Sequence, residues 1–124
     1  MTPVLIRQWS LGDADELRVL RRGLRAEIGD GELFERMAVV GTELATNALR
    51  HGCPPVTVRL LAEPARLTLD VSDGDPASEP LFGTRRPFGA GGLGLLLVRT
   101  FARDSGWYRR GASKHVWAVF DHRA

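Results

Sequence analysis

The sequence predicts an α+β fold, a two-layer α/β sandwich in which helices cover one face of a mixed, mostly antiparallel sheet. Two amphipathic helical patterns lie between a first strand-like run and two alternating runs, and a further helix and two further strands follow. Strands joined by short links pair as hairpins, and helices on such a sheet gather on one face. At 124 residues the chain fits one domain.

The first half of the chain is expected to hold one strand and two helices. The strand covers residues 3–9, which are rich in β-branched and apolar side chains. Residues 13–28 repeat apolar side chains at intervals of three and four, and Asp13 is a suitable N-cap. The second helix extends from about residue 31 to 51 and ends before Gly52.

The second half is expected to hold four strands and one helix. Residues 56–63 and 66–73 form a hairpin, in which alternation gives one packed face and one more polar face. A helix follows over residues 93–103. Two more strands lie around 106–109 and 114–121, and the second is apolar on both alternations, as a central strand is.

Residues 74–94 interrupt the regular elements because they are rich in glycine and proline. Long loops of this kind inside a compact domain are either functional lids or disordered segments. We expect a lid over about residues 74–92.

Composition excludes several classes of protein. The net charge is +2, from 17 basic and 15 acidic side chains spread along the chain, so no concentrated basic patch for nucleic acid is present. The lone Cys53 cannot form an internal disulfide. No apolar run has the roughly 18 residues of a membrane span, and the N-terminus lacks a signal-peptide pattern. We expect a soluble, cytoplasmic protein with no nucleic-acid or membrane partner.

A polar stripe on the second helix is the first candidate site. Glu43, Asn47 and His51 follow at intervals of four, each about 40° round the helix from the last. They supply a base, a neutral oxygen ligand for a hard cation and a donor for an anion. The alternative is a solvated stripe on the flank of a buried helix, with His51 favoured by the helix dipole.

The second candidate is Asp73, which ends a strand and is followed directly by Gly74. A carboxylate there can accept a hydrogen bond from an exocyclic amine such as that of adenine, and the glycine lets a flat ring approach. The alternative is an Asp-Gly turn in which the carboxylate binds its own backbone.

The third candidate is the glycine-rich start of the helix at residues 93–103. Free N–H groups and the positive end of the helix dipole suit phosphate. The alternative is a helix that simply begins after a flexible loop. The residues concerned are Gly89, Gly91, Gly92 and Gly94.

Taken in order, the patterns ExxxNAxxHG, DGDP and GxGGLGL resemble the N, G1 and G2 boxes of the GHKL (Bergerat-fold) ATPases. The resemblance covers roughly residues 38–120. The short chain and the closing GASKHVWAVF are similar to the stand-alone bacterial ATP-binding domains related to anti-sigma-factor serine kinases.

This resemblance implies ATP and Mg²⁺ as cofactors and a role for each residue. Asn47 would coordinate Mg²⁺ between the phosphates, Glu43 would act as general base, and His51 would lie near the phosphates. Asp73 with Gly74 would bind adenine. The loop around the phosphates would consist of Gly91, Gly92, Leu93 and Gly94.

The chain departs from the family pattern at three places. His115 stands where a Thr is common, which puts a water-mediated adenine contact in doubt. The G1 box is DGDP and not DxGxG, which leaves a second contact to the ring unassigned. Arg85 and Arg86 lie in the expected lid, where they either reach phosphate or form a solvated pair.

The resemblance implies a Mg-ATP-dependent kinase that phosphorylates a Ser or Thr on a small partner protein. Its partners would be a sigma factor or an anti-anti-sigma-like protein, and a homodimer stays open. The alternative is a nucleotide-gated interaction module with little turnover. A third reading is the detached catalytic domain of a histidine kinase.

Overall fold

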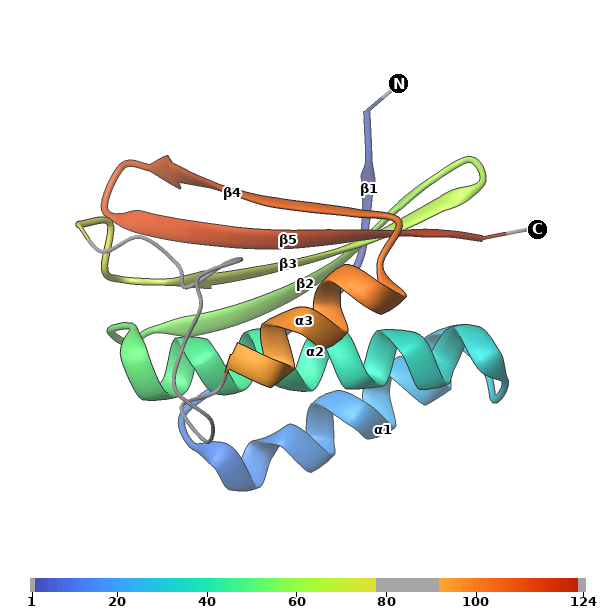
Figure 1. Ribbon diagram of the computed structural model, residues 1–124, viewed down its shortest axis with the longest axis horizontal. Coiled ribbons are helices and arrows are strands. Elements are labelled where there is room, and N and C mark those ends of the chain that lie inside the picture. Colours follow the sequence, from blue (N-terminus) through green and yellow to red (C-terminus); the bar gives the residue numbers. More distant parts are fainter. Residues whose placement is uncertain (1, 78–91, 123–124) are drawn as a thin grey trace.

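The computed structural model describes residues 2–77 and 92–122, which form two layers: a five-stranded sheet and three α-helices on one of its faces (Figure 1). The predicted α+β class is therefore confirmed. The second helix lies in the middle of the helical layer, between the first and the third.

The sheet has the strand order β1-β2-β3-β5-β4, and each of its four pairings is antiparallel. The first strand extends two residues past its predicted end at residue 9, because the buried Leu11 still pairs with Val56. The last strand lies between two others, as its double apolar alternation predicted. The strands are β1 (Val4–Leu11), β2 (Val56–Glu63), β3 (Arg66–Asp73), β4 (Asp104–Arg110) and β5 (Ser113–Asp121).

The helices follow the predicted positions, with small differences at their ends. Asp13 caps the first one as expected, since its carboxylate accepts a hydrogen bond from the N–H of Asp15 at 2.9 Å, but the first turn is a 3-10 helix. None of the helices among the described residues is both long and apolar enough to cross a membrane. The helices are η1 (Ala14–Glu16), α1 (Leu17–Ile28), α2 (Glu32–His51) and α3 (Gly92–Phe101).

Helix α2 packs on the sheet through the face that its periodicity predicted. Its buried side chains include Met37, Val40, Leu44 and Ala48. Gly41 belongs to this face, and a Cβ added there would lie 3.3 Å from Cδ1 of Leu69 on β3. The small residue lets the helix approach the sheet closely, which fixes the height of α2 above the strands.

Helix α1 contacts the edge strand β1 where Gly23 of the helix meets Trp9 of the strand. The indole ring of Trp9 is buried over Gly23, and its N–H has no hydrogen-bond partner among the described residues. A Cβ added at Gly23 would lie 2.5 Å from Nε1 and 2.7 Å from Cζ2 of the ring. The ring therefore occupies the space that a side chain at residue 23 would need.

We expect Gly23→Ala to destabilise the protein by about 1–3 kcal/mol through overpacking, although alanine is the better helix former. The free energy of unfolding in urea measures the change. In the Trp9→Phe background the same substitution should cost less, because the smaller ring leaves room for the methyl group. Arg22→Ala, at the exposed neighbouring position, is the control. A Gly23→Ala variant as stable as the wild type would show that the ring can move aside.

Candidate functional site

The end of α2 packs directly against the end of β3, at the end of the molecule where the β4–β5 hairpin also lies (Figure 1). A Cβ added at Gly52 would lie 2.5 Å from Oδ2 of Asp73. One residue further on, the N–H of Gly74 donates a 2.6 Å hydrogen bond to the carbonyl of Cys53. The residues that directly follow His51 at the end of α2 therefore lie against the predicted Asp73-Gly74 turn.

The three residues of the polar stripe differ in their exposure. Glu43 and Asn47 are half-buried on α2, and His51, in its last turn, is exposed. Within the described part of the chain, the side chains of Glu43 and Asn47 have no hydrogen-bond or ion-pair partner. Their polar atoms are therefore not committed to any contact among residues 2–77 and 92–122.

The glycine-rich candidate is described only in part. The backbone of Gly92, Leu93 and Gly94 forms the first turn of α3. Gly91 lies outside the described residues, as do most of the expected lid and Arg85 and Arg86 within it. Helix α3 packs against α2, and it begins on the side of the molecule to which the end of α2 points (Figure 1).

Asp73 has a partner that the sequence interpretation did not identify. Its Oδ2 forms an ion pair with Nζ of Lys114 at 3.5 Å, and both side chains are almost fully buried, with exposed fractions of 4% and 6%. Its Oδ1 accepts a hydrogen bond from the N–H of Asp75 at 2.8 Å. The Asp-Gly turn of the alternative interpretation is therefore present, but only one carboxylate oxygen serves it.

The position of Lys114 follows from the register of β3 and β5. Asp73 lies opposite Lys114, and Ser72 lies opposite His115. Because successive side chains alternate between the faces of a strand, Asp73 and Lys114 lie on the helix-covered face with the core residue Val71. Continuing the alternation of β5 back from Phe120 would have placed Lys114 on this face.

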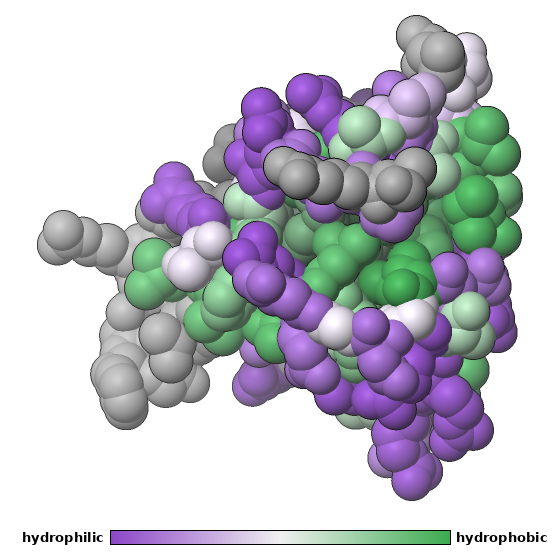
Figure 2. All heavy atoms as spheres, turned by 90° about the vertical axis from the view of Figure 1, so that its right-hand side faces the viewer, coloured by the Kyte–Doolittle hydropathy of each residue, from purple (hydrophilic) through white to green (hydrophobic). Residues whose placement is uncertain are grey.

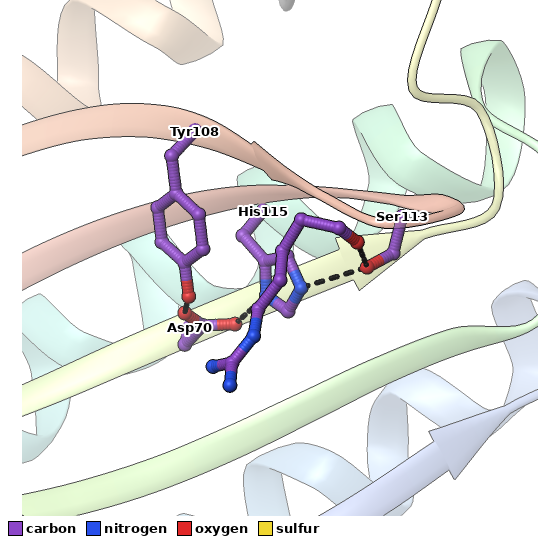
Figure 3. A network of polar contacts seen from close by, with 5 residues as sticks. Asp70, Tyr108, Ser113 and His115 are labelled. Carbon is purple, nitrogen blue, oxygen red and sulfur yellow. Dashed lines mark hydrogen bonds and ion pairs between the residues drawn. The ribbon is translucent and has the colours of Figure 1, made fainter.

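His115 lies on the opposite face of the sheet, which none of the helices among residues 2–77 and 92–122 covers, in a polar network with Asp70, Tyr108 and Ser113 (Figure 3). Its Nδ1–H donates to Oδ1 of Asp70 at 2.7 Å, and the hydroxyl of Tyr108 donates to Oδ2 at 2.9 Å. The rings of Tyr108 and His115 stack with their centroids 4.7 Å apart. His115 is thereby fully engaged on the face away from α2.

Ser113 completes this network on the other side of the imidazole. Its Oγ lies 2.9 Å from Nε2 of His115, and it is also 2.9 Å from the carbonyl oxygen of Arg110, to which it donates. The network was not predicted, because its members come from three strands and meet only through the register.

The environment of Tyr108 changes its acidity. Partial burial raises the pKa of Tyr108 above its ordinary value of 10.0, and the hydrogen bond to Asp70 and the charge of that carboxylate raise it further. Arg59 and Arg110 act in the opposite direction. The net effect favours the neutral hydroxyl that donates to Asp70.

A pocket of about 220 Å³ lies at the other end of the helical layer, far along α2 from the predicted site residues. Figure 2 shows this end of the molecule, with an apolar hollow surrounded by hydrophilic side chains. None of the predicted site residues that the structure describes lines this pocket. Its lining includes Leu33, Arg36, Phe101, Arg103 and Phe120.

The described residues offer no cluster of three or more His, Cys, Asp or Glu side chains that could hold a metal ion. Magnesium, however, keeps several waters and binds through one or two protein ligands together with substrate phosphates. The half-buried carboxamide of Asn47, whose oxygen has no partner among the described residues, fits such a site.

The chain was compared with protein-family models and with curated proteins. The family model described as "Histidine kinase-like ATPase domain" matches residues 13–120, which is most of the chain. A comparison with curated proteins gave no match.

Ionisation of Tyr108, the only tyrosine of the chain, can be followed by its absorbance near 295 nm. We expect a midpoint above pH 10.0, and Asp70→Asn should lower it only in part, because burial remains the largest cause. Since the folded pKa is raised, the stability that this hydroxyl contributes is present below pH 10 and is lost as the pH rises through the folded pKa. Asp15→Asn, at an exposed position in η1, should leave the midpoint unchanged. A wild-type midpoint at or below 10.0 would contradict the assignment.

Proposed function

The chain belongs to the family of histidine kinase-like ATPase domains, and from this premise we propose that it is an ATP-binding regulatory protein of the anti-sigma-factor serine kinase type. It transfers the γ-phosphate of Mg-ATP to a serine or threonine of a small partner protein. The observation that supports the proposal is that the end of α2, the helix that carries Glu43, Asn47 and His51, packs against Asp73 and Gly74.

The phosphate end of the proposed site is built from α2 and the start of α3. Asn47 binds Mg²⁺ through its carboxamide oxygen, and His51 lies near the phosphates. When bound, the metal supplies charge neutralisation on the phosphates. The N–H groups at the start of α3 suit the phosphate oxygens because the helix dipole is positive there. The phosphate loop consists of Gly91, Gly92, Leu93 and Gly94.

Glu43 is the proposed general base. It lies one helical turn before Asn47, and its carboxylate has no partner among the described residues. The hydroxyl oxygen of the partner protein attacks the γ-phosphorus, the bond from that phosphorus to the bridging oxygen breaks, and ADP leaves. The proton of the hydroxyl passes to Glu43.

Asp73 and Gly74 form the proposed adenine end of the site. Among the described residues, the polar partner of Asp73 Oδ2 is Nζ of Lys114 at 3.5 Å, so Oδ2 retains a lone pair that can accept a hydrogen bond from the 6-amino group. A Cβ added at Gly74 would lie 2.6 Å from the carbonyl of Pro54, so the backbone is too crowded for any side chain. Asp75 closes the turn beside them through its N–H.

The remaining parts of the proposal concern the context of the domain. The whole chain, residues 1–124, forms one ATP-binding domain with a lid over about residues 74–92. The protein partner is a sigma factor or an anti-anti-sigma-like protein, and a second copy of the chain is a further option. A cytoplasmic location supplies ATP and keeps a free thiol such as the exposed Cys53 reduced.

The role of Asn47 is tested by titrating the full chain with a fluorescent ATP analogue, with and without Mg²⁺. We expect Asn47→Ala to weaken binding in Mg²⁺ by about tenfold or more, which corresponds to ~1.4 kcal/mol, because the metal loses its protein ligand. Thr46→Ala is the matched control, since the neighbouring side chain lies about 100° round the helix. Equal affinities for Asn47→Ala and the wild type would remove Asn47 from the metal site.

The role of Glu43 is tested by phosphate transfer from labelled ATP to candidate partner proteins. We expect Glu43→Gln to bind Mg-ATP as the wild type does but to transfer phosphate about 10²–10⁴-fold more slowly, as the loss of a general base does. The control is Glu35→Gln, an exposed carboxylate in the first turn of α2.

The alternative function, a nucleotide-gated interaction module, gives a different result in the same experiment. The module interpretation is correct if ATP alters partner binding without forming a phosphoprotein, and if Glu43→Gln leaves this ATP-dependent binding unchanged. Failure of the wild-type chain to bind ATP would contradict both functions.

A further inference from the structure

The buried pair of Asp73 and Lys114 points to a second recognition element for the nucleotide base. This inference rests on the proposed function, since it concerns the same adenine site. Lys114 is the only lysine of the chain, and every other strongly basic side chain is arginine. This single ammonium group is also almost fully buried, on the helix-covered face of the sheet.

The ion pair by itself does not account for a buried ammonium. A charge taken out of water is costly unless close partners satisfy it. Nζ of Lys114 carries three hydrogens, and its one partner among the described residues is Oδ2 of Asp73, at 3.5 Å. Charge-assisted hydrogen bonds are usually 2.7–2.9 Å long. The contact is therefore a loose ion pair that leaves donor capacity on Nζ.

No other side chain of β5 is placed to take this role. His115, the next residue, lies on the opposite face, where Asp70 and Ser113 hold both of its ring nitrogens. Ser113, the residue before Lys114, belongs to the same outer network as His115. Lys114 is thus the polar side chain that β5 contributes beside Asp73 on the face covered by α2.

The pair matches one edge of adenine. At that edge the 6-amino group donates a hydrogen bond and the adjacent ring nitrogen N1 accepts one. Asp73 offers an acceptor and Lys114 a donor, side by side on neighbouring strands. We propose that Lys114 is a specificity-determining residue that donates to N1 of the base while Asp73 accepts from the 6-amino group.

The proposal predicts which bases bind. Guanine and hypoxanthine carry an oxygen at position 6 and a hydrogen on N1, so both positions present the wrong group to this pair. A buried site that leaves its polar groups unpaired rejects such a ligand strongly. With the base held so that its 6-position faces Asp73 and N1 faces Lys114, the pair therefore selects adenine over the 6-oxo purines.

The test compares ATP with 1-deazaadenosine triphosphate, in which a C–H replaces N1 and the amino group is retained. For the wild-type full chain we expect the analogue to bind about 10- to 100-fold more weakly, as the loss of one charge-assisted hydrogen bond implies. Lys114→Met should bind the two nucleotides with equal affinity. Arg109→Met, on the neighbouring strand, is the control and should keep the difference.

A second measurement covers the case in which Lys114→Met leaves Asp73 unpaired and does not fold. With isotopically labelled lysine, the wild-type chain has a single side-chain Nζ resonance, because it has one lysine. We expect ATP to shift this resonance and the 1-deaza analogue to shift it much less.

The outcomes separate this inference from the proposed function. If the wild type binds ATP and the 1-deaza analogue equally, Lys114 does not contact N1, and the proposed ATP function stands without it. If both nucleotides move the Nζ resonance alike, the inference is also wrong. A chain that binds neither nucleotide contradicts the proposed function itself.

Discussion

The contact between the end of α2 and the end of β3 is the constraint on which the rest of the site depends. Gly52 lies so close to the carboxylate of Asp73 that no side chain fits at residue 52. The hydrogen bond from Gly74 to Cys53 ties the backbones together just beyond this point. Because Asp73 is buried and Gly52 is half-buried, the end of α2 cannot shift along the sheet without moving Asp73 as well.

The alternation of β3 and β5 then divides the polar residues between two environments. Asp73 and Lys114 lie on the helix-covered face, whereas Asp70 and His115 lie on the open face. Each face holds a carboxylate with a cationic or potentially cationic partner, but their settings differ. In the outer network, hydrogen bonds join four side chains, those of Asp70, Tyr108, Ser113 and His115. The inner pair leaves Nζ of Lys114 with donor capacity. Recognition chemistry is therefore expected on the inner face and structural stabilisation on the outer one.

The sequence was sufficient for the elements that depend on local periodicity. The apolar face of α2, the β2–β3 hairpin and the Asp13 cap arise from residues close in the chain, and all three were predicted correctly. The end of β1 was placed too early because its extension to Leu11 depends on pairing with Val56, far along the chain. Local patterns do not contain that information.

The candidate site was predictable to a similar extent. The motifs indicated which residue types to consider, but the partner of Asp73 depends on the register between β3 and β5, which are separated in the chain by the loop, α3 and β4. The same register places His115 on the face of the sheet away from α2, in contact with Asp70. The roles of Glu43 and Asn47 remain predictions that the nucleotide experiments test.

Residue 114 is a lysine, whereas the other strongly basic side chains of the chain are arginines. If Asp73 and Lys114 contact the base as proposed, this choice has a physical reason. An arginine would meet Asp73 with a planar fork and bind both carboxylate oxygens at once. Oδ1 already accepts from the N–H of Asp75, so such a fork would compete with the turn and occupy Oδ2. An ammonium is a compact charge that can neutralise Oδ2 from 3.5 Å and still direct a hydrogen elsewhere. Lysine is therefore the basic side chain that keeps Asp73 both compensated and available to a ligand.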